Sequence, residues 1–351
     1  MPPMIDEYRG YLQGERNLAL PTVRNYLDDL KPLFEFLKIE HIDVSSTMAE
    51  FRAFILRNAK DSINREYRRF LLSYLAWLMN TRITNNNRKN SSQGHRRSSA
   101  VRHLASLRSF FRFLIVKNYM PHAPIWKRGS TTMRGLIPKT AKRLPQVLHK
   151  MEAEVIISAP SRLVPNKRAT PLQLRDAALL EIMYGSGLRL SEVVDIDLDD
   201  LDMKNRNLRV RGKGRKERMV PLSRPSVDAL GKYLHMGRPH LVVDQTKKEL
   251  FSNRYGSRLS RRRVQGLVKH YALKAGLDSN VRPHTLRHSF ATHLLDGGAD
   301  IRVVQELLGH STPTTTQIYT HISPTQARKV YLAAHPRATR SEVKNGNISG
   351  N

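Results

Sequence analysis

The sequence predicts a mainly α-helical protein of two domains with one small antiparallel sheet, an α+β fold. Apolar residues recur at helical spacing through most of the chain, and one pair of short strand-like stretches flanks a glycine-rich turn. Prolines and basic residues gather over 120–146 and interrupt this pattern. With 351 residues the chain is long enough for two cores. We therefore expect a helical domain over 1–119, a basic linker over 120–146, a second domain over 147–335 and a flexible tail over 336–351.

In the first domain, each expected helix carries an apolar stripe that predicts the core of a helical bundle. The second helix follows Pro21, and Pro32 inside it predicts a kink. The polar, basic stretch 84–99 has no apolar periodicity and is predicted to be a flexible loop. The other expected helices cover 4–16, 47–58, 63–79 and 100–117.

In the second domain, a hairpin is predicted from strands over 208–211 and 217–221, with Lys213 at its bend. Two glycines in Gly185-Ser-Gly187 permit a tight connection, and Ser186 or Ser191 can cap the helix that follows. Longer helices are expected over 151–158, 171–184, 225–236, 260–275 and 325–334.

The balance of charges indicates a polyanionic partner. The net charge is +30, from 60 Lys and Arg against 30 Asp and Glu, and the isoelectric point is about 10.7. Nucleic acid is the simplest such partner, because its phosphates are neutralised by cationic side chains. A ribosomal-type protein usually carries basic tails, and a protein that binds anionic membranes needs a basic amphipathic anchor, which is not found in this sequence.

Other features of composition bear on the cellular compartment and on metals. The absence of cysteine excludes disulfides and thiolate metal sites. The chain starts without the apolar core of a signal peptide, and Arg108 and Arg112 interrupt its most apolar helix. We expect a cytoplasmic, nucleoid-associated protein with no membrane partner.

The densest chemistry lies in the stretch 283–322. His284 and Arg287 are three residues apart and share one face of a helix. His310 is expected on a loop, with Tyr319 about two turns into the helix that follows. A tyrosine beside cations and proton carriers is the arrangement expected when its oxygen attacks a phosphate.

Transfer of a phosphodiester without a metal needs two cations, a nucleophile and a proton donor. Arginine is suited to the cationic role because it is always charged and binds phosphate in a bidentate manner. Each candidate residue is a weak signal alone, since a single arginine here is usually a surface residue and a single tyrosine usually belongs to a core. His288 and His293 are interpreted as structural. Zinc bound by His284, His288 and His293 is disfavoured, because no carboxylate or thiolate accompanies them and Arg287 would lie beside the metal.

Four motifs in order resemble the catalytic boxes of the tyrosine recombinase (phage integrase) family, and most closely its Xer branch. They are Gly187-Leu-Arg-Leu-Ser-Glu, Val210-Arg-Gly-Lys-Gly-Arg-Lys-Glu-Arg, Pro283-His-Thr-Leu-Arg-His-Ser-Phe-Ala-Thr-His and Leu308-Gly-His-Ser-Thr-Pro-Thr-Thr-Thr-Gln-Ile-Tyr-Thr-His. The resemblance spans nearly the whole chain and includes the ending Ala333-Ala-His-Pro-Arg-Ala. Two departures are the longer loop at 84–99 and the additional tail beyond Ala338.

The resemblance implies a role for each matching residue. Tyr319 would be the nucleophile, forming a 3′-phosphotyrosyl link and releasing a 5′ hydroxyl. Arg189 and Arg287 would hold the scissile phosphate. Because the covalent link keeps the energy of the broken bond, neither a metal nor another cofactor is expected.

The remaining roles concern proton transfer and support. Lys213 would be the general acid for the leaving 5′ oxygen, and His284 a general base or proton relay. His310 would donate a hydrogen bond to the phosphate, and Glu192 would support Arg189. Phosphate contacts are expected from exposed basic residues, namely Arg24, Arg102, Arg108, Arg112, Lys127 and Arg254.

The resemblance also implies an assembly. The first domain would be a core-binding, SAM-like domain, and the two domains would form a C-shaped clamp around a double-stranded DNA recombination site. A homo- or hetero-tetramer would act on two sites, with a DNA translocase as regulator. Val330 and Tyr331 are candidate contacts with a neighbouring protomer.

Several functions remain open at this point. Resolution of chromosome or plasmid dimers is favoured, and an integrase or transposase of a mobile element would use the same chemistry, as would a topoisomerase-like nicking-closing enzyme. A non-catalytic DNA-binding protein on this scaffold and a basic RNA-binding protein are alternatives of other classes.

Overall fold

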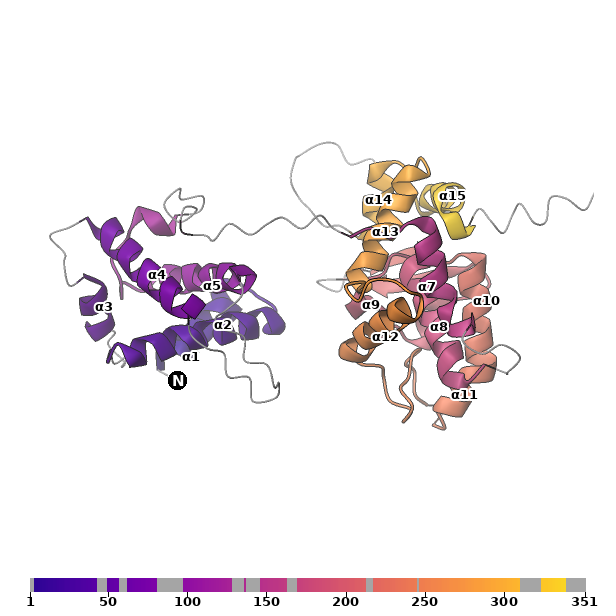
Figure 1. Cartoon of the computed structure of the whole chain (residues 1–351), viewed down its shortest axis with the longest axis horizontal. Helices are drawn as coiled ribbons and strands as arrows, with labels where there is room; N and C mark the ends of the chain where they lie inside the picture. The colour runs from indigo at the N-terminus through magenta and orange to yellow at the C-terminus, as the bar shows by residue number, and fades with distance from the viewer. Residues whose placement is uncertain are drawn as a thin grey trace, which may run out of the picture. The chain divides into compact units, whose positions relative to one another are not determined.

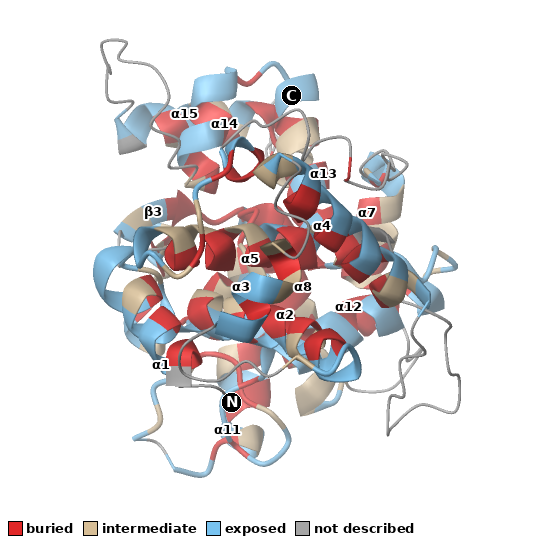
Figure 2. Ribbon diagram, turned by 90° about the vertical axis from the view of Figure 1, so that its left-hand side faces the viewer, coloured by how far each residue is buried: buried red, intermediate tan, exposed pale blue. Residues whose placement is uncertain are grey.

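The structure is a computed structural model. It describes residues 3–42, 49–56, 62–80, 97–127, 136, 146–162, 169–212, 217–244, 246–309 and 323–338. The chain divides into two compact units, Met1–Arg143 and Leu144–Asn351 (Figure 1). Buried residues gather in the interior of the units, and exposed residues cover the outer faces of the helices (Figure 2). Among the described helices, none combines the length and the apolar character needed to cross a bilayer.

The named elements of the first unit, in its described part, are all helices. Its elements are α1 (Pro3–Gly10), η1 (Tyr11–Glu15), α2 (Leu20–Ile39), α3 (Ala49–Leu56), α4 (Ile63–Asn80), α5 (Arg97–Val116) and the 3-10 helix η2 (Pro124–Trp126). Helix α2 remains helical through Pro32. Most of the predicted loop 84–99 lies outside the described residues. Its last three residues belong to α5, so the loop prediction is wrong there.

The segment 120–127 is part of the core of the first unit. Trp126 is 2% exposed and stacks on Phe111, with ring centroids 4.2 Å apart and planes 7° from parallel. Arg112 Nε donates to Trp126 O at 3.2 Å, and Tyr67 Oη donates to Pro121 O at 2.9 Å. The prediction of a basic linker is therefore wrong for these residues, because apolar side chains among the prolines and cations complete the core.

The second unit combines helices with a three-stranded antiparallel sheet in the order β1-β2-β3. Its first elements are α7 (Lys150–Arg162), α8 (Pro171–Gly185), α9 (Leu190–Val194), η3 (Leu198–Asp200), β1 (Leu201–Asp202), β2 (Asn207–Arg211) and β3 (Glu217–Pro221). Then follow α10 (Arg224–Lys232), η5 (Tyr233–Gly237), α11 (Arg238–Leu241), α12 (Arg261–Lys274), α13 (Pro283–Asp296), α14 (Ile301–Leu308) and α15 (Pro324–Ala334). The predicted hairpin strands are present, with Leu208 opposite Val220. Its bend residue Lys213 lies outside the described residues.

Helix α8 is the central helix of the second unit. It begins after Thr170, whose Oγ1 accepts from Gln173 N at 3.3 Å, and Pro171 occupies its first position. All residues over 178–185 are buried, so this half of the helix is covered on every side. Because α8 is fixed in the core, the glycine turn at its end is held in place.

The end of α15 also belongs to the core. Tyr331 is 0% exposed, and its Oη donates to Gly185 O at 2.8 Å. His335 and Ala338 are buried, and Arg337 forms an ion pair with Glu181. The prediction of a flexible tail over 336–351 is therefore wrong for 336–338, and 339–351 lie outside the described residues. The expected contact of Tyr331 with a neighbouring protomer is wrong, because its side chain is used inside the unit.

Replacing Trp126 by alanine should lower the free energy of unfolding of the first unit by about 3–5 kcal/mol, because the substitution removes a fully buried aromatic side chain. Denaturant unfolding of the full chain, followed by circular dichroism, measures the change. Leu72→Ala in α4 is the control: Leu72 is 46% exposed, and its loss should have a much smaller effect. Equal effects of the two substitutions would contradict the assignment of 120–127 to the core.

Candidate active site

The site begins at the turn between α8 and α9. Gly187 has φ +57°, and a Cβ on it would lie 2.3 Å from the Phe290 ring. Only glycine combines this backbone conformation with such close packing. The turn buries Leu188 and places Arg189 immediately before the first residue of α9. The position of Arg189 is therefore set by the backbone of the turn.

Glu192, one turn into α9, binds two arginines. Its Oε2 accepts from Arg189 N and its Oε1 from Arg189 Nη1, both at 2.8 Å. Arg218 on β3 donates to Oε1 at 2.9 Å and to Oε2 at 3.0 Å. Burial would raise the pKa of Glu192, but the hydrogen bonds from Arg218 and Arg189 outweigh it and hold this pKa below its ordinary value. The carboxylate is therefore ionised at neutral pH.

Arg287 reaches the same place from α13. Its Nη1 donates to Gly187 O at 2.6 Å and its Nη2 to Leu308 O at 2.7 Å, and Nη1 lies 4.0 Å from Glu192 Oε2. Burial, reinforced by the nearby Arg189 charge, lowers the pKa of Arg287 to about 10. The guanidinium is thus charged at neutral pH but poorly solvated, a condition that a bound anion would relieve.

The three arginines also bind the last carbonyl groups of α14. Arg218 Nε donates to Leu307 O at 3.0 Å, Arg287 to Leu308 O, and Arg189 Nη2 to Gly309 O at 2.8 Å. These carbonyls have no partners within the helix and carry the negative end of its dipole. We call Arg189, Arg218, Arg287 and Glu192 the arginine cluster.

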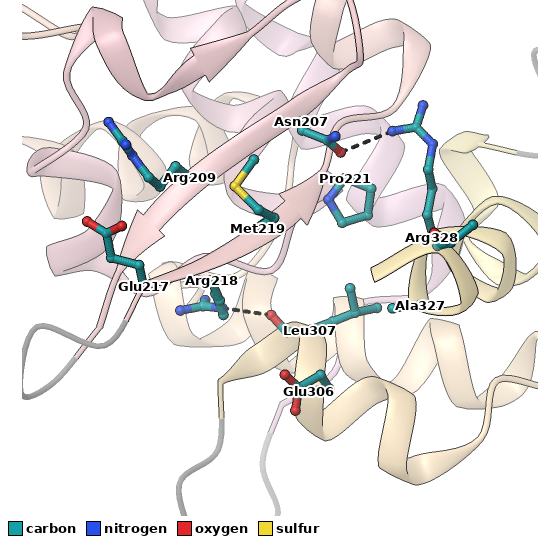
Figure 3. A pocket seen from close by; sticks show the side chains of 11 residues that line it. Asn207, Arg209, Glu217, Arg218, Met219, Pro221, Glu306, Leu307, Ala327 and Arg328 are labelled. Atoms are coloured by element: carbon teal, nitrogen blue, oxygen red, sulfur yellow. Dashed lines mark hydrogen bonds between the residues drawn. The ribbon is translucent and has the colours of Figure 1, made fainter. Parts of the chain in front are cut away.

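Two cavities adjoin the cluster. One of about 440 Å³ contains Arg287 and is lined by Gln146, His284, Thr285, Arg287, His288, Ala291 and Leu308. The other, of about 520 Å³, lies between the sheet and helices α14 and α15, with Arg218 beside Leu307 and Arg328 beside Asn207 (Figure 3). Of the predicted catalytic residues, His284 and Arg287 line the first cavity. The described lining of the second includes neither of these two residues.

The structure brings together Arg189, Glu192 and Arg287, as the sequence predicts. His284 is exposed, one turn before Arg287. The other predicted catalytic residues, Lys213, His310 and Tyr319, lie outside the described residues.

Sequence reasoning missed Arg218. In β3 the inward positions alternate, and Arg218 lies two residues before the buried Val220. An arginine on the inward face of a short strand was the available signal.

His293 has a structural role. Its Nε2 donates to Leu148 O at 2.9 Å, and its Nδ1 accepts from Tyr184 Oη at 2.8 Å. Burial lowers the pKa of His293, which favours the neutral ring that this pattern requires. Because both ring nitrogens of His293 are occupied, its structural interpretation agrees with the sequence reasoning. His288 is exposed and lines the first cavity, so the expected packing role is wrong for that residue.

The predicted phosphate contacts fall into two groups. Arg24, Arg102, Lys127 and Arg254 are exposed, whereas Arg108 and Arg112 are half-buried. Arg108 donates to Lys127 O at 3.3 Å, so both half-buried arginines hold the segment that contains Trp126.

Two of the exposed arginines also have partners within their units. Arg102 Nη1 lies 2.5 Å from the buried Asp29 Oδ1, and Arg254 lies over the Tyr255 ring at 4.6 Å. Contact of these residues with DNA stays a prediction.

Comparison with known proteins gives matches over nearly the whole chain. Residues 146–326 match the phage integrase family, and residues 5–66 match the phage integrase N-terminal SAM-like domain. Tyrosine recombinase XerC of Pelotomaculum thermopropionicum is 38% identical over 338 residues, which are 95% of this chain and 98% of the relative. Tyrosine recombinase XerD of Staphylococcus epidermidis is 35% identical over 341 residues, 96% of this chain and 100% of the relative.

Solved structures show the same fold. XerH site-specific recombinase bound to difH substrate, in a pre-cleavage complex, aligns with TM-score 0.58 and 21% identity over 93% of this chain and 83% of that one. The Tn1549 transposon integrase in complex with circular intermediate DNA aligns with TM-score 0.57 and 18% identity, over 97% of this chain and 98% of that one.

Replacing Gly187 by alanine should lower the free energy of unfolding of the second unit by about 2–4 kcal/mol, because the new Cβ collides with Phe290 in a backbone conformation that alanine avoids. Gly231→Ala in α10 is the matched control: nothing lies within 4 Å of the place that its new methyl group would take, so it should be neutral or stabilising by up to about 1 kcal/mol. Differential scanning calorimetry distinguishes them. A Gly187→Ala protein as stable as wild type would refute the packing argument.

Glu192 should make the stability of the second unit dependent on pH. Since folding lowers its pKa from the ordinary 4.5, its stabilisation is complete above pH 4.5 and is lost as pH falls through the lower folded value. The difference in melting temperature between wild type and Glu192→Gln should therefore be large at pH 7 and shrink in acid. The exposed Glu40→Gln supplies the control. A difference that is constant from pH 7 to pH 3.5 would contradict the assigned pKa.

Proposed function

Because the chain belongs to the phage integrase family, we propose that Arg189 and Arg287 of its arginine cluster bind the scissile phosphate of a DNA recombination site. The chain is a tyrosine recombinase, which cleaves and rejoins DNA through a tyrosine, and its activity is site-specific recombination. The proposal assigns this activity to particular residues.

The observation that carries the assignment is the charge of the cluster. Three guanidinium groups and one carboxylate give 3 − 1 = +2 at neutral pH. The side chain of Arg189 is 35% exposed, so it has donors available to a ligand. A fixed, partly buried pair of arginines attracts a phosphate and stabilises the charge that develops on its nonbridging oxygens. Arg189 and Arg287 are therefore the proposed phosphate ligands.

In the proposed reaction, the Tyr319 oxygen attacks the phosphorus while the bond to the 5′ oxygen of the next nucleotide breaks. Lys213 donates a proton to that leaving oxygen, and His284 accepts the tyrosine proton directly or through a relay. His310 donates a hydrogen bond to the phosphate. The product is a 3′-phosphotyrosyl link and a 5′ hydroxyl. Rejoining reverses the step when a 5′ hydroxyl attacks the link, so the phosphodiester is regenerated without an external energy source.

The proposed biological role is the resolution of chromosome or plasmid dimers. Relatives named XerC and XerD cover nearly the full length of this chain, which supports this role over the alternative of a mobile-element integrase. The proposed assembly is a homo- or hetero-tetramer on two recombination sites in the nucleoid, regulated by a DNA translocase. Its N-terminal domain would clamp the duplex together with the catalytic domain.

Wild-type protein should form a covalent adduct with a nicked duplex that carries a candidate chromosomal recombination site, because the nick lets the short fragment with the new 5′ hydroxyl diffuse away after cleavage. Tyr319→Phe should bind the same DNA and form no adduct, since it lacks the attacking oxygen. A denaturing gel measures the adduct, and Tyr255→Phe, which changes an exposed tyrosine of the same unit, should behave as wild type. An adduct with Tyr319→Phe, or tight binding of every candidate site without any adduct, would overturn the proposal.

A further inference from the structure

We propose that Arg218 is a positioning residue of the active site, which holds Glu192 and offsets its charge so that Arg189 and Arg287 retain a full double positive charge for the phosphate. This inference rests on the proposed function of the arginine cluster. It assigns a role to a side chain that does not itself touch the substrate.

The geometry of Arg218 distinguishes it from the two phosphate ligands. Its Nη1 and Nη2 bind the two oxygens of Glu192 side by side, and its Nε binds Leu307 O. Its side chain is 12% exposed, against 35% for Arg189. The paired donors that an arginine would present to a phosphate are therefore already occupied by the carboxylate. Arg218 acts on Glu192 and on the end of α14.

The packing around Arg218 leaves little freedom to its guanidinium. A Cβ on Gly309 would lie 3.0 Å from Arg218 Nη1, and Gly309 has φ +65°, so the glycine lets the backbone approach the guanidinium closely. Arg218 thus connects β3 to the end of α14 as well as to α9. A fixed guanidinium at this point holds the carboxylate in one orientation.

The charges explain why the site needs a third arginine. The Glu192 side chain is 2% exposed, so water does little to screen its charge. Without Arg218, one buried carboxylate would face Arg189 and Arg287 alone, and the net charge of the site would fall from +2 to +1. Glu192 would also lose two of its hydrogen bonds, while the burial that raises its pKa would remain.

The test is a charge-rescue experiment with the full chain. Arg218→Gln should slow single-turnover cleavage of the nicked duplex by about 10–100-fold, because the phosphate site loses net charge and Glu192 loses its support. Binding of the same DNA should change less than about threefold, since most phosphate contacts lie elsewhere. The double variant Arg218→Gln/Glu192→Gln should cleave at least about fivefold faster than Arg218→Gln, because removing the carboxylate charge restores the net charge of +2.

The pH profile gives a second signature. In Arg218→Gln, acidification should protonate Glu192 and raise the cleavage rate relative to wild type, and the double variant should lose this response. A residue that merely supported the fold would show these effects in stability alone and would leave the cleavage rate constant of the folded fraction unchanged, so both responses must be measured in that rate constant. Arg218→Lys keeps the charge but cannot bind both carboxylate oxygens side by side, so its rate should lie between those of wild type and Arg218→Gln.

Arg238→Gln is the matched control. Arg238 is also buried, at 5% exposure, and it donates to Lys247 O at 2.7 Å and to Glu249 O at 3.0 Å, with no carboxylate partner among the described residues. This variant should lose stability and keep the cleavage rate constant of its folded fraction. If Arg218→Gln does not remain folded at the assay temperature, Arg218→Lys and the double variant test whether Arg218 positions the active site. A wild-type rate in Arg218→Lys would then overturn the inference.

The outcomes separate this inference from the proposed function. If wild type forms a Tyr319-dependent adduct and Arg218→Gln cleaves at the wild-type rate, the role of Arg218 is wrong and the proposed function stands. A double variant as slow as Arg218→Gln also rejects the charge argument. If wild type forms no adduct, the proposed function itself fails.

Discussion

The geometry of the candidate active site depends on the carbonyl groups at the end of α14, which accept hydrogen bonds from arginine side chains. A helix ends with carbonyls that its own backbone cannot satisfy, and these must find donors where water is scarce. Here Leu307, Leu308 and Gly309 each bind a different arginine, from β3, α13 and the turn before α9. One helix end therefore collects three cations that are far apart in the sequence. The left-handed Gly309 ends the helix there and leaves its carbonyl pointing at Arg189.

Three cations gathered this way would repel one another without a counter-charge. Glu192 supplies this counter-charge. Its carboxylate accepts hydrogen bonds from Arg189 and Arg218 and lies 4.0 Å from Arg287 Nη1. A single carboxylate lowers the repulsion without neutralising the site. Burial and the neighbouring Arg189 charge depress the pKa of Arg287, and an anionic ligand, as proposed above, would offset both effects.

The sequence predicted the structural features that depend on the periodicity of apolar residues and on the spacing of motifs. The main helices, the hairpin strands and the grouping of Arg189, Glu192 and Arg287 followed from local patterns and from the four motifs. Arg218 was missed because the side to which a strand residue points is decided by tertiary packing, and in a chain with 60 Lys and Arg another arginine carries little information. The segment around Trp126 was taken for a linker because prolines and cations outnumber its few apolar residues. Those few residues fill the space beside Phe111, and composition alone does not reveal that packing.

The hydrogen bond between Tyr331 and Gly185 has a consequence for synthesis of the protein. Gly185 ends the helix that leads to Arg189, yet its carbonyl is bound by a side chain 146 positions further along the chain. Proteins are made from the N-terminus, and the first unit can fold while the second is still emerging from the ribosome. The turn that carries Arg189 acquires this support only after α15 has left the exit tunnel. Until then the growing chain lacks one of the side-chain contacts that hold the turn before Arg189.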